Sequence, residues 1–340
     1  MATLGQSGKV TLLDIAKATD PNGRIGDVAE LLTQTNEILL DMPWYEGNLP
    51  TGHKGIVRTG LPTAVWRQMY QGVPPAKSVK AQVEDACGML ETRSEVDKDI
   101  AELNGNLAAF RMSEATSFVE AMNQTMASTI FYGNAATNPE QFNGLAIRYS
   151  AISGATNATN IISGGAASGQ TDCASIWLVV WGPQTVFGIY PKGSKAGLQH
   201  EDLGLIDAFD TNSFRFRAYA DWWQWKCGLH VKDWRYVVRI CNIDTSNLIA
   251  QTGAADLTKL MVRAIARIPH ESMGTPVFYA NRTVKEMLSI QALDKSQNAL
   301  SITEALRQFG GVDVSMKELN FLGIPIRTVD KLTTTEAVVA

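Results

Sequence analysis

The sequence has few cysteines, and their spacing is not that of a disulfide framework or a bound metal. The four cysteines, at positions 87, 173, 227 and 241, form no CxxC pair. Small disulfide-stapled domains and zinc knuckles are therefore excluded. A reducing compartment is the best match for this cysteine usage.

The chain also lacks an excess of positive charge, a signal peptide and a long apolar run. Its 30 Lys and Arg side chains stand against 34 Asp and Glu, a formal net charge of -4 over 340 residues. Proteins that coat nucleic acid are usually strongly basic, so we do not expect one here. No window approaches the ~18 apolar residues that span a bilayer, and residues 1–20 lack a charged-then-apolar pattern. We expect a soluble protein that starts inside the cell.

The motifs that carry most enzyme chemistry are missing. No GxGxxG, HExxH or GxSxG pattern occurs. Residues 188–195 approach a phosphate-binding loop, but Ser194 precedes Lys195, whereas the motif needs the lysine first. His200–Asp202 and His270–Glu271 place possible metal ligands side by side, yet adjacent residues point apart. We predict no catalytic residue, no cofactor and no metal site, and hence no enzyme.

The N-terminal part of the chain has little capacity to build a core of its own. Apolar spacing over residues 12–16 and 25–32 predicts two short helices. The first indicates an arm, and the second is either a satellite helix on the core or part of an arm that packs on a neighbouring subunit. Residues 43–75 are rich in glycine and proline and alternate in short pieces, which predicts a β-hairpin or long extended loop. An excursion of this length is typical of an interaction element. We expect this loop to clasp another subunit, and the alternative is an ordinary surface hairpin.

Three residues of the loop are the candidate subunit contacts. They are Trp66, Arg67 and Tyr70. Large aromatic and arginine side chains dominate the binding energy of buried interfaces. The sequence therefore predicts the interface in this region.

A long helix and a small-residue stretch divide the chain. Apolar side chains at helical spacing from about Ser113 to Gly133 predict a helix of roughly 20 residues, which would be about 30 Å long. Residues 76–103 are dense in mixed charge and read as a solvated strand leading into a loop or short helix. Residues 151–172 are nearly all Gly, Ala, Ser, Thr, Asn and Ile, which is typical of a flexible crossing between domains. We place a domain boundary near residue 150.

The second half mixes strands and helices. Apolar runs and alternation predict strands over residues 175–181, 185–189, 214–219, 231–240, 276–279 and 321–329. Helical spacing predicts helices over residues 256–268, after residue 279 through Met287, and over residues 302–309, ending at Gly310–Gly311. Because strands and helices follow no regular βαβ alternation, the pattern indicates the α+β class.

Aromatic and cationic side chains interleave over residues 214–239. Four of the eight tryptophans fall between positions 222 and 234. Aromatics beside cations can stack on a sugar or on single-stranded nucleic acid. The alternation of apolar and charged residues favours instead a strand pair that serves as scaffold or subunit interface.

Three stretches, together with the order of elements, resemble major capsid proteins of tailed bacteriophages, in the short form found in short-tailed phages. They are Asn-Pro-Glu-Gln-Phe-Asn-Gly-Leu-Ala-Ile-Arg-Tyr at 138–149, Val-Phe-Tyr-Ala-Asn-Arg-Thr-Val-Lys-Glu-Met at 277–287, and Phe-Leu-Gly-Ile-Pro-Ile-Arg-Thr-Val-Asp at 321–330. The resemblance covers nearly the whole chain.

The resemblance implies the tailed-phage major capsid fold. Its parts would be an N-terminal arm (1–43), an extended β-hairpin loop (44–80), a peripheral domain with a spine helix (81–150 and 319–340) and an axial domain (151–318). It implies a structural coat protein that self-assembles as hexamers and pentamers into an icosahedral head around phage double-stranded DNA. The implied partners are further copies of the chain and decoration, scaffolding and portal proteins, with no sequence-specific DNA contact and no membrane. The implied location is the virion capsid, assembled in the bacterial host cytoplasm.

Two alternatives stay open at this point. A non-viral encapsulating shell of the same fold would hold cargo enzymes instead of DNA. A carbohydrate- or nucleic-acid-processing enzyme would need Trp222, Trp223 and Trp225 to line a concave surface near carboxylates.

Overall fold

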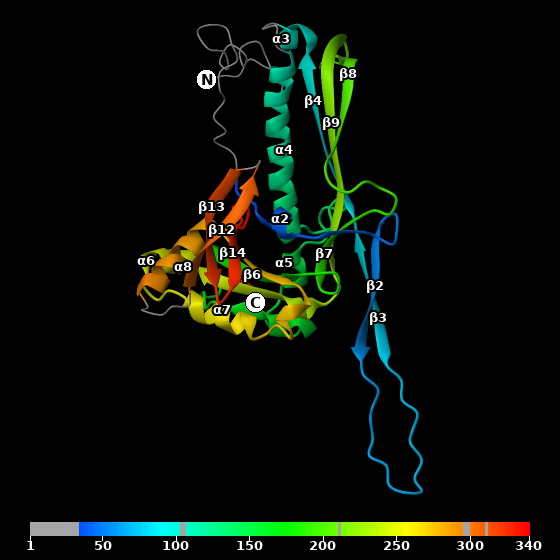
Figure 1. Ribbon diagram of the computed structural model, residues 1–340, viewed down its shortest axis with the longest axis vertical. Helices are drawn as coiled ribbons and strands as arrows, with labels where there is room; N and C mark the ends of the chain where they lie inside the picture. Colours follow the sequence, from blue (N-terminus) through cyan, green and yellow to red (C-terminus); the bar gives the residue numbers. More distant parts are fainter. Residues whose placement is uncertain (1–33, 103–106, 210–211, 295–299, 310–311) are drawn as a thin grey trace. The chain divides into compact units, whose positions relative to one another are not determined.

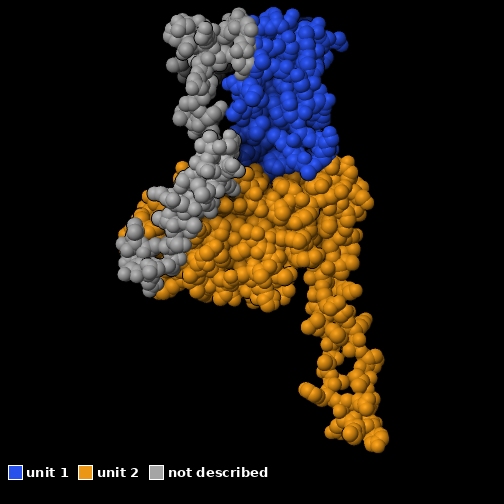
Figure 2. All heavy atoms as spheres, in the orientation of Figure 1, with its two compact units in different colours: residues 1–34, 89–126, 195–226 blue, residues 35–88, 127–194, 227–340 orange. Residues whose placement is uncertain are grey.

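A computed structural model describes residues 34–102, 107–209, 212–294, 300–309 and 312–340 (Figure 1). The chain divides into two compact units (Figure 2). Unit 1 comprises residues 1–34, 89–126 and 195–226, and unit 2 comprises residues 35–88, 127–194 and 227–340. The two helices predicted over residues 12–16 and 25–32 lie outside the described residues.

The described residues form both helices and strands. The helices are α2 (Ile38–Asp41), α3 (Lys98–Glu102), α4 (Leu107–Tyr132), α5 (Leu145–Arg148), α6 (Thr245–Ala250), α7 (Leu257–Ile265) and α8 (Arg282–Asp294), with 3-10 helices η1 (Thr156–Asn160), η2 (Trp234–Tyr236) and η3 (Glu271–Met273). The strands are β1 (Trp44–Glu46), β2 (Gly52–Gly60), β3 (Val79–Ala86), β4 (Gly88–Asp97), β5 (Ile161–Ser163), β6 (Cys173–Trp181), β7 (Val186–Tyr190), β8 (Gln199–Phe209), β9 (Arg215–Val231), β10 (Val237–Asp244), β11 (Thr275–Ala280), β12 (Leu300–Phe309), β13 (Val312–Phe321) and β14 (Ile324–Thr328). The mixture confirms the predicted α+β class.

Strand β6 is the centre of unit 2. It pairs antiparallel with β10 on one side and β11 on the other, and β11 pairs in parallel with β14. All nine residues of β6 are buried, which explains its continuous apolar sequence. Its alternate residues Ile176, Leu178 and Val180 share a core with buried side chains of α6, α7 and α8. This core anchors the rest of unit 2.

The helices predicted over residues 256–268 and after residue 279 are confirmed as α7 and α8. Helix α7 begins after Asp256, whose carboxylate accepts a hydrogen bond from the Lys259 backbone N–H. An aspartate at this position satisfies a backbone donor that the first turn leaves unpaired. The buried side chains Leu257, Leu260, Met261 and Ala264 occupy one face of the helix, as the apolar spacing predicts.

The extended hairpin is also confirmed, but it uses more of the chain than the glycine-rich stretch alone. Strand β2 pairs antiparallel with β3 from Gly52↔Ala86 to Gly60↔Val79. The second strand therefore comes from the charge-rich stretch that follows. Residues 61–78 form the loop that joins the two strands.

Unit 1 contains the first part of α4 and strands that run beside one another. Strand β8 pairs antiparallel with β9 from Gln199↔Gln224 to Phe209↔Arg215. Helix α4 has 26 residues, and at ~1.5 Å per residue it is about 39 Å long. It begins at Leu107, before the predicted start at Ser113.

The predicted helix over residues 302–309 is wrong. This segment is strand β12, which pairs antiparallel with β13 from Leu300↔Phe321 to Phe309↔Val312. In sequence, a Gly-Gly dipeptide is compatible with a helix end, but it is equally typical of a connection between two strands. Pairing with β13 makes this segment a strand and not a helix, and the local sequence of residues 302–309 does not reveal that pairing.

Three further predictions need correction. The strand predicted over residues 231–240 is interrupted by η2, because the Asp233 carboxylate accepts from the Arg235 backbone N–H and turns the chain. The strand predicted over residues 321–329 is two strands, β13 and β14, separated by Leu322 and Gly323 at φ 49° and 85°. The small-residue stretch 151–172 is not wholly a loop, since β5 within it pairs in parallel with β10.

Candidate functional site

The three residues predicted as subunit contacts lie in the loop between β2 and β3. Trp66 and Tyr70 have relative exposures of 105% and 103%, so neither packs on another part of the chain. Arg67 is exposed beside them. Figure 1 shows this loop at the far end of the hairpin, away from the sheet of unit 2. The structure thus brings all three residues into one solvent-facing loop.

The rest of the loop is apolar and cationic. Further exposed apolar side chains in it are Leu61, Val65, Met69 and Val73. Between Gly55 and Val83 the sequence has four basic residues, Arg58, Arg67, Lys77 and Lys80, and no acidic one. Exposed apolar groups gathered in this way mark an interaction site.

Buried polar groups fix the root of the hairpin within unit 2. Asp85 on β3 is 6% exposed, and its carboxylate accepts from Arg148 Nη2 and from His230 Nδ1, each at 2.7 Å. Burial raises the pKa of this carboxyl group, but the His230 hydrogen bond and the Arg148 charge outweigh burial, so the pKa of Asp85 lies below its ordinary value. Asp85 is therefore a carboxylate at neutral pH. Its contacts with Arg148 and His230 fix the base of the hairpin, whereas the side chains at the far end of the hairpin are exposed to solvent.

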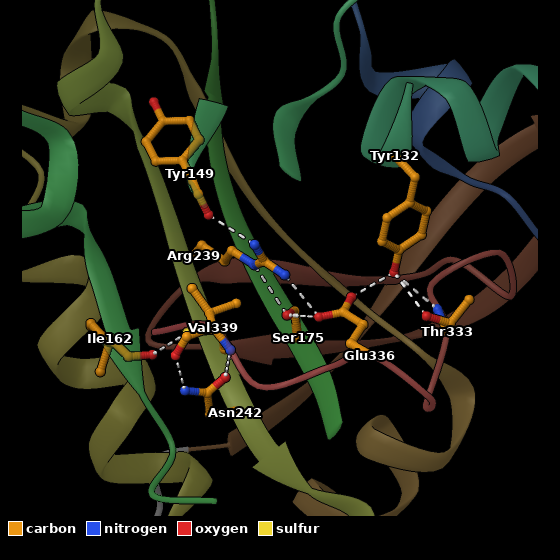
Figure 3. Close-up of polar contacts among 10 residues, drawn as sticks. Tyr132, Tyr149, Ile162, Ser175, Arg239, Asn242, Thr333, Glu336 and Val339 are labelled. Carbon is orange, nitrogen blue, oxygen red and sulfur yellow. Dashed lines mark hydrogen bonds and ion pairs between the residues drawn. The ribbon is translucent and has the colours of Figure 1, made fainter. Parts of the chain in front are cut away.

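A second buried polar cluster joins residues 329–340 to the sheet (Figure 3). Arg239 on β10 and Glu336 are 5% and 9% exposed, and Arg239 Nη2 lies 2.9 Å from Glu336 Oε2. Tyr132 donates its hydroxyl hydrogen to Glu336 Oε1 at 2.6 Å, and Ser175 donates to Glu336 Oε2. Burial and then the Glu336 charge raise the pKa of the Tyr132 hydroxyl. The carboxylate thus gathers a cation and two hydroxyl groups from three elements.

Backbone pairing extends this cluster along the same segment. The Glu336 N–H donates to the Cys173 carbonyl at 2.8 Å. The Asn242 side chain pairs with both backbone groups of Val339, donating to its carbonyl at 2.9 Å and accepting from its N–H at 2.8 Å. Figure 3 shows the two Asn242–Val339 hydrogen bonds next to the Arg239 cluster. We call residues 329–340 the strap, because they are bound across the sheet.

Sequence reasoning missed both buried clusters. Asp85 stands in a stretch dense in charges, where most carboxylates are solvated. The cation nearest to Glu336 in the sequence is Lys331, whereas its partner Arg239 is 97 positions away. The only available signal was Arg239, a charged residue inside a strand pattern of apolar residues, which implies a buried partner. Nothing local identifies that partner.

The tryptophan-rich stretch is part of the scaffold of unit 1. Trp223 is buried and its ring stacks on Phe118 of α4 at a centroid distance of 5.4 Å. Nearby, Arg111 of α4 forms ion pairs with Asp202 and Asp221 at 2.5 and 2.8 Å. These contacts join α4 to β8 and β9, so this Trp223 face serves packing.

Trp222 of this stretch lines a described hollow. The hollow is open to solvent, has a volume of about 540 Å³ and is lined by Glu91, Thr92, Arg93, Leu203 and Trp222. The enzyme alternative needs Trp223 on the same concave surface, but Trp223 is packed on Phe118. The geometry therefore does not support a three-tryptophan platform.

Metal-binding clusters and membrane-spanning helices are both absent from the part of the chain that the structure describes. Within that part, no group of three or more His, Cys, Asp and Glu residues could hold a metal ion. None of the described helices is both long enough and apolar enough to cross a membrane.

Comparisons with known proteins bear on the whole chain. A family model described as Major capsid protein GP7 matches residues 20–340. A chain in the structure of bacteriophage Epsilon15 is 35% identical, with 100% of both chains covered and a TM-score of 0.76. The bacteriophage JBD30 capsid shares the fold, with 6% identity, a TM-score of 0.51, and 89% of this chain and 93% of that chain covered. No curated protein matches the chain.

Proposed function

The chain belongs to the Major capsid protein GP7 family and is a structural protein of the viral capsid, and we propose that its copies assemble as hexamers and pentamers into the icosahedral head of a tailed phage. The head encloses double-stranded DNA without sequence-specific contact. The observation that carries the proposal is the 35% identity to the Epsilon15 chain over the full length of both. This identity favours a phage coat over a cargo-holding shell or an enzyme.

The parts of the chain then have separate tasks in the shell. We assign residues 1–43 to an arm, 44–80 to the extended loop, 81–150 with 319–340 to a peripheral domain, and 151–318 to an axial domain at the centre of each capsomer. The hairpin β2–β3 supports the loop assignment, and α4 supports a spine helix in the peripheral domain.

The contact between copies that we propose is made by Trp66, Arg67 and Tyr70. Their full exposure in a cationic apolar loop supports this role, because a single chain gains nothing from exposing two large aromatic rings. Decoration, scaffolding and portal proteins are further partners, and assembly takes place in the bacterial host cytoplasm. The protein has no enzymatic activity in this scheme.

Electron microscopy of the purified protein, with sedimentation to size the particles, tests the proposal. We expect closed particles or rings of five and six copies. If the chain alone stays small, it is coexpressed with the proteins encoded next to it, which supply a missing scaffold. A protein that remains a monomer or dimer after coexpression contradicts the proposed shell.

A further inference from the structure

Two histidines meet at the root of the hairpin. His53 on β2 and His230 on β9 have ring centroids 4.6 Å apart. Both rings also contact Phe187 on β7, at 5.6 Å from His53 and 5.1 Å from His230. His230 is fully buried, with 0% exposure. The hairpin therefore packs against the rest of unit 2 through three rings, those of His53, Phe187 and His230.

The hydrogen bonds of the cluster are incomplete. A carboxylate only accepts, so the 2.7 Å contact with Asp85 places a proton on His230 Nδ1, and Nε2 is the second nitrogen of this ring. That Nε2 atom and His53 Nδ1 are both buried, and neither has a hydrogen-bond partner among the described residues. Buried ring nitrogens of this kind are sensitive to any added proton, because no acceptor is in place to stabilise it.

The charges around His53 disfavour its protonated form. His230 on β9 and Lys232 directly after β9 face it, and Asp85 faces it from β3. Asp85 is the one carboxylate among the groups that act on His53, and Arg148 of α5 already forms an ion pair with it. Burial first, and then His230 and Lys232, lower the pKa of His53 below its ordinary value of 6.5, and Asp85 acts in the opposite direction without reversing this.

We propose that His53 and His230 form an acid-sensitive anchor: when His53 takes up a proton, β2 loosens from the rings of Phe187 and His230, and the hairpin β2–β3 is freed to change its angle. The proposal concerns a single chain and does not depend on the shell. In a shell it means that the segment reaching neighbouring copies is held at neutral pH and released by acid.

The direction of the pH effect follows from the lowered pKa of His53. The anchored state favours the neutral ring, so the anchor has its full strength above the ordinary pKa of 6.5. It weakens as the pH falls below that value toward the lowered pKa. Asp85 has its pKa below 3.8 and acts in a separate, more acidic range.

Hydrogen exchange of the full chain at pH 7.5 and pH 5.5 tests the anchor. After correction for the intrinsic pH dependence of exchange, we expect β2 amides to exchange several-fold faster at pH 5.5. One proton changes an opening equilibrium by at most about tenfold per pH unit, which sets the upper limit. Amides of β6 serve as the internal control and keep their protection. Equal protection of β2 at both pH values would overturn the proposal.

Variants identify the responsible residue. His53→Phe keeps a ring against Phe187 but cannot take up a proton, so its β2 amides are expected to stay protected at pH 5.5. His270→Gln, at an exposed histidine, is the matched control and keeps the wild-type response. A His53→Phe protein that loses protection as the wild type does contradicts the proposal. If this variant does not fold, the wild-type His53 ring is titrated by NMR, and a pKa of 6.5 or above refutes the anchor.

Discussion

At the scale of single residues, the buried pair Arg239 and Glu336 has the largest expected effect on stability. Burial of each charge costs solvation free energy, and the attraction between the two charges offsets this cost only while both are present. Glu336→Gln keeps the shape of the side chain but leaves Arg239 buried without a counter-charge. We expect the free energy of unfolding to fall by about 3–5 kcal/mol, measured by urea denaturation.

The control for this change is Glu286→Gln on the exposed side of α8, which is expected to change stability by under about 0.5 kcal/mol. A double variant, Arg239→Met with Glu336→Leu, removes both charges and is expected to recover much of the loss. A Glu336→Gln protein as stable as the wild type would show that the ion pair does not hold the strap.

For Trp66 we expect no effect on the stability of the single chain, because its side chain is fully exposed. Trp66→Ala is expected to leave the unfolding transition of the isolated chain unchanged. Removing an interface aromatic that is buried on assembly costs about 2 kcal/mol or more per contact, so shell formation and heat resistance of the shell are expected to fall. Sedimentation and thermal scanning of assembled particles measure this.

The neighbouring substitution Gln68→Ala is the matched control for Trp66→Ala, since it lies in the same exposed loop without a large aromatic ring. It is expected to assemble as the wild type does. If Trp66→Ala shells retain their heat resistance, Trp66 is not the contact we propose.

At the scale of elements, Gly55 is the position where β2 approaches His230 so closely that there is no room for a side chain. A Cβ atom there would lie 2.9 Å from His230 Nε2. Gly55→Ala therefore forces β2 away from the ring, and we expect faster hydrogen exchange in β2 already at neutral pH. Gly72→Ala in the loop is the control, because a Cβ at Gly72 meets no described atom within 4 Å. Unchanged exchange in Gly55→Ala would mean that β2 does not rest on His230.

Elements with local signals were predictable from sequence, and those defined by distant partners were not. Helix α7 has its cap at Asp256 and its apolar face within nine residues, so its limits can be read locally. Strand β12 has helix-compatible spacing, and only the pairing with β13 fixes it as a strand. In the same way, the exposed loop residues follow from composition, whereas Asp85 and His230 are 145 positions apart and meet only in the fold.

At the scale of the whole molecule, charge is unevenly distributed. The chain has a net charge of -4, yet the segment from Gly55 to Val83 has four basic residues and no acid. A hairpin that contacts another copy is therefore drawn to an oppositely charged surface. Screening shortens the reach of such attraction from about 10 Å at 0.1 M salt to about 3 Å at 1 M. We expect assembly, followed by light scattering, to weaken as salt rises.

Arg67→Gln is expected to reduce this salt dependence, and Arg263→Gln on α7 to leave it unchanged. Assembly that is equally strong at low and high salt would show that the contact is apolar alone.

The strap sets an order of events during synthesis. Arg239 and Glu336 are 97 positions apart, and a ribosome adding ~5–20 residues per second needs roughly 5–20 s to make the chain between them. Throughout this interval Arg239 lacks its counter-charge, while the loop with Trp66 has already left the ribosome. With the role proposed for the loop, each newborn chain exposes its contact residues before its own fold is closed. Neighbouring chains on one messenger are consequently exposed to premature association, and a wide spacing of ribosomes on the messenger reduces it.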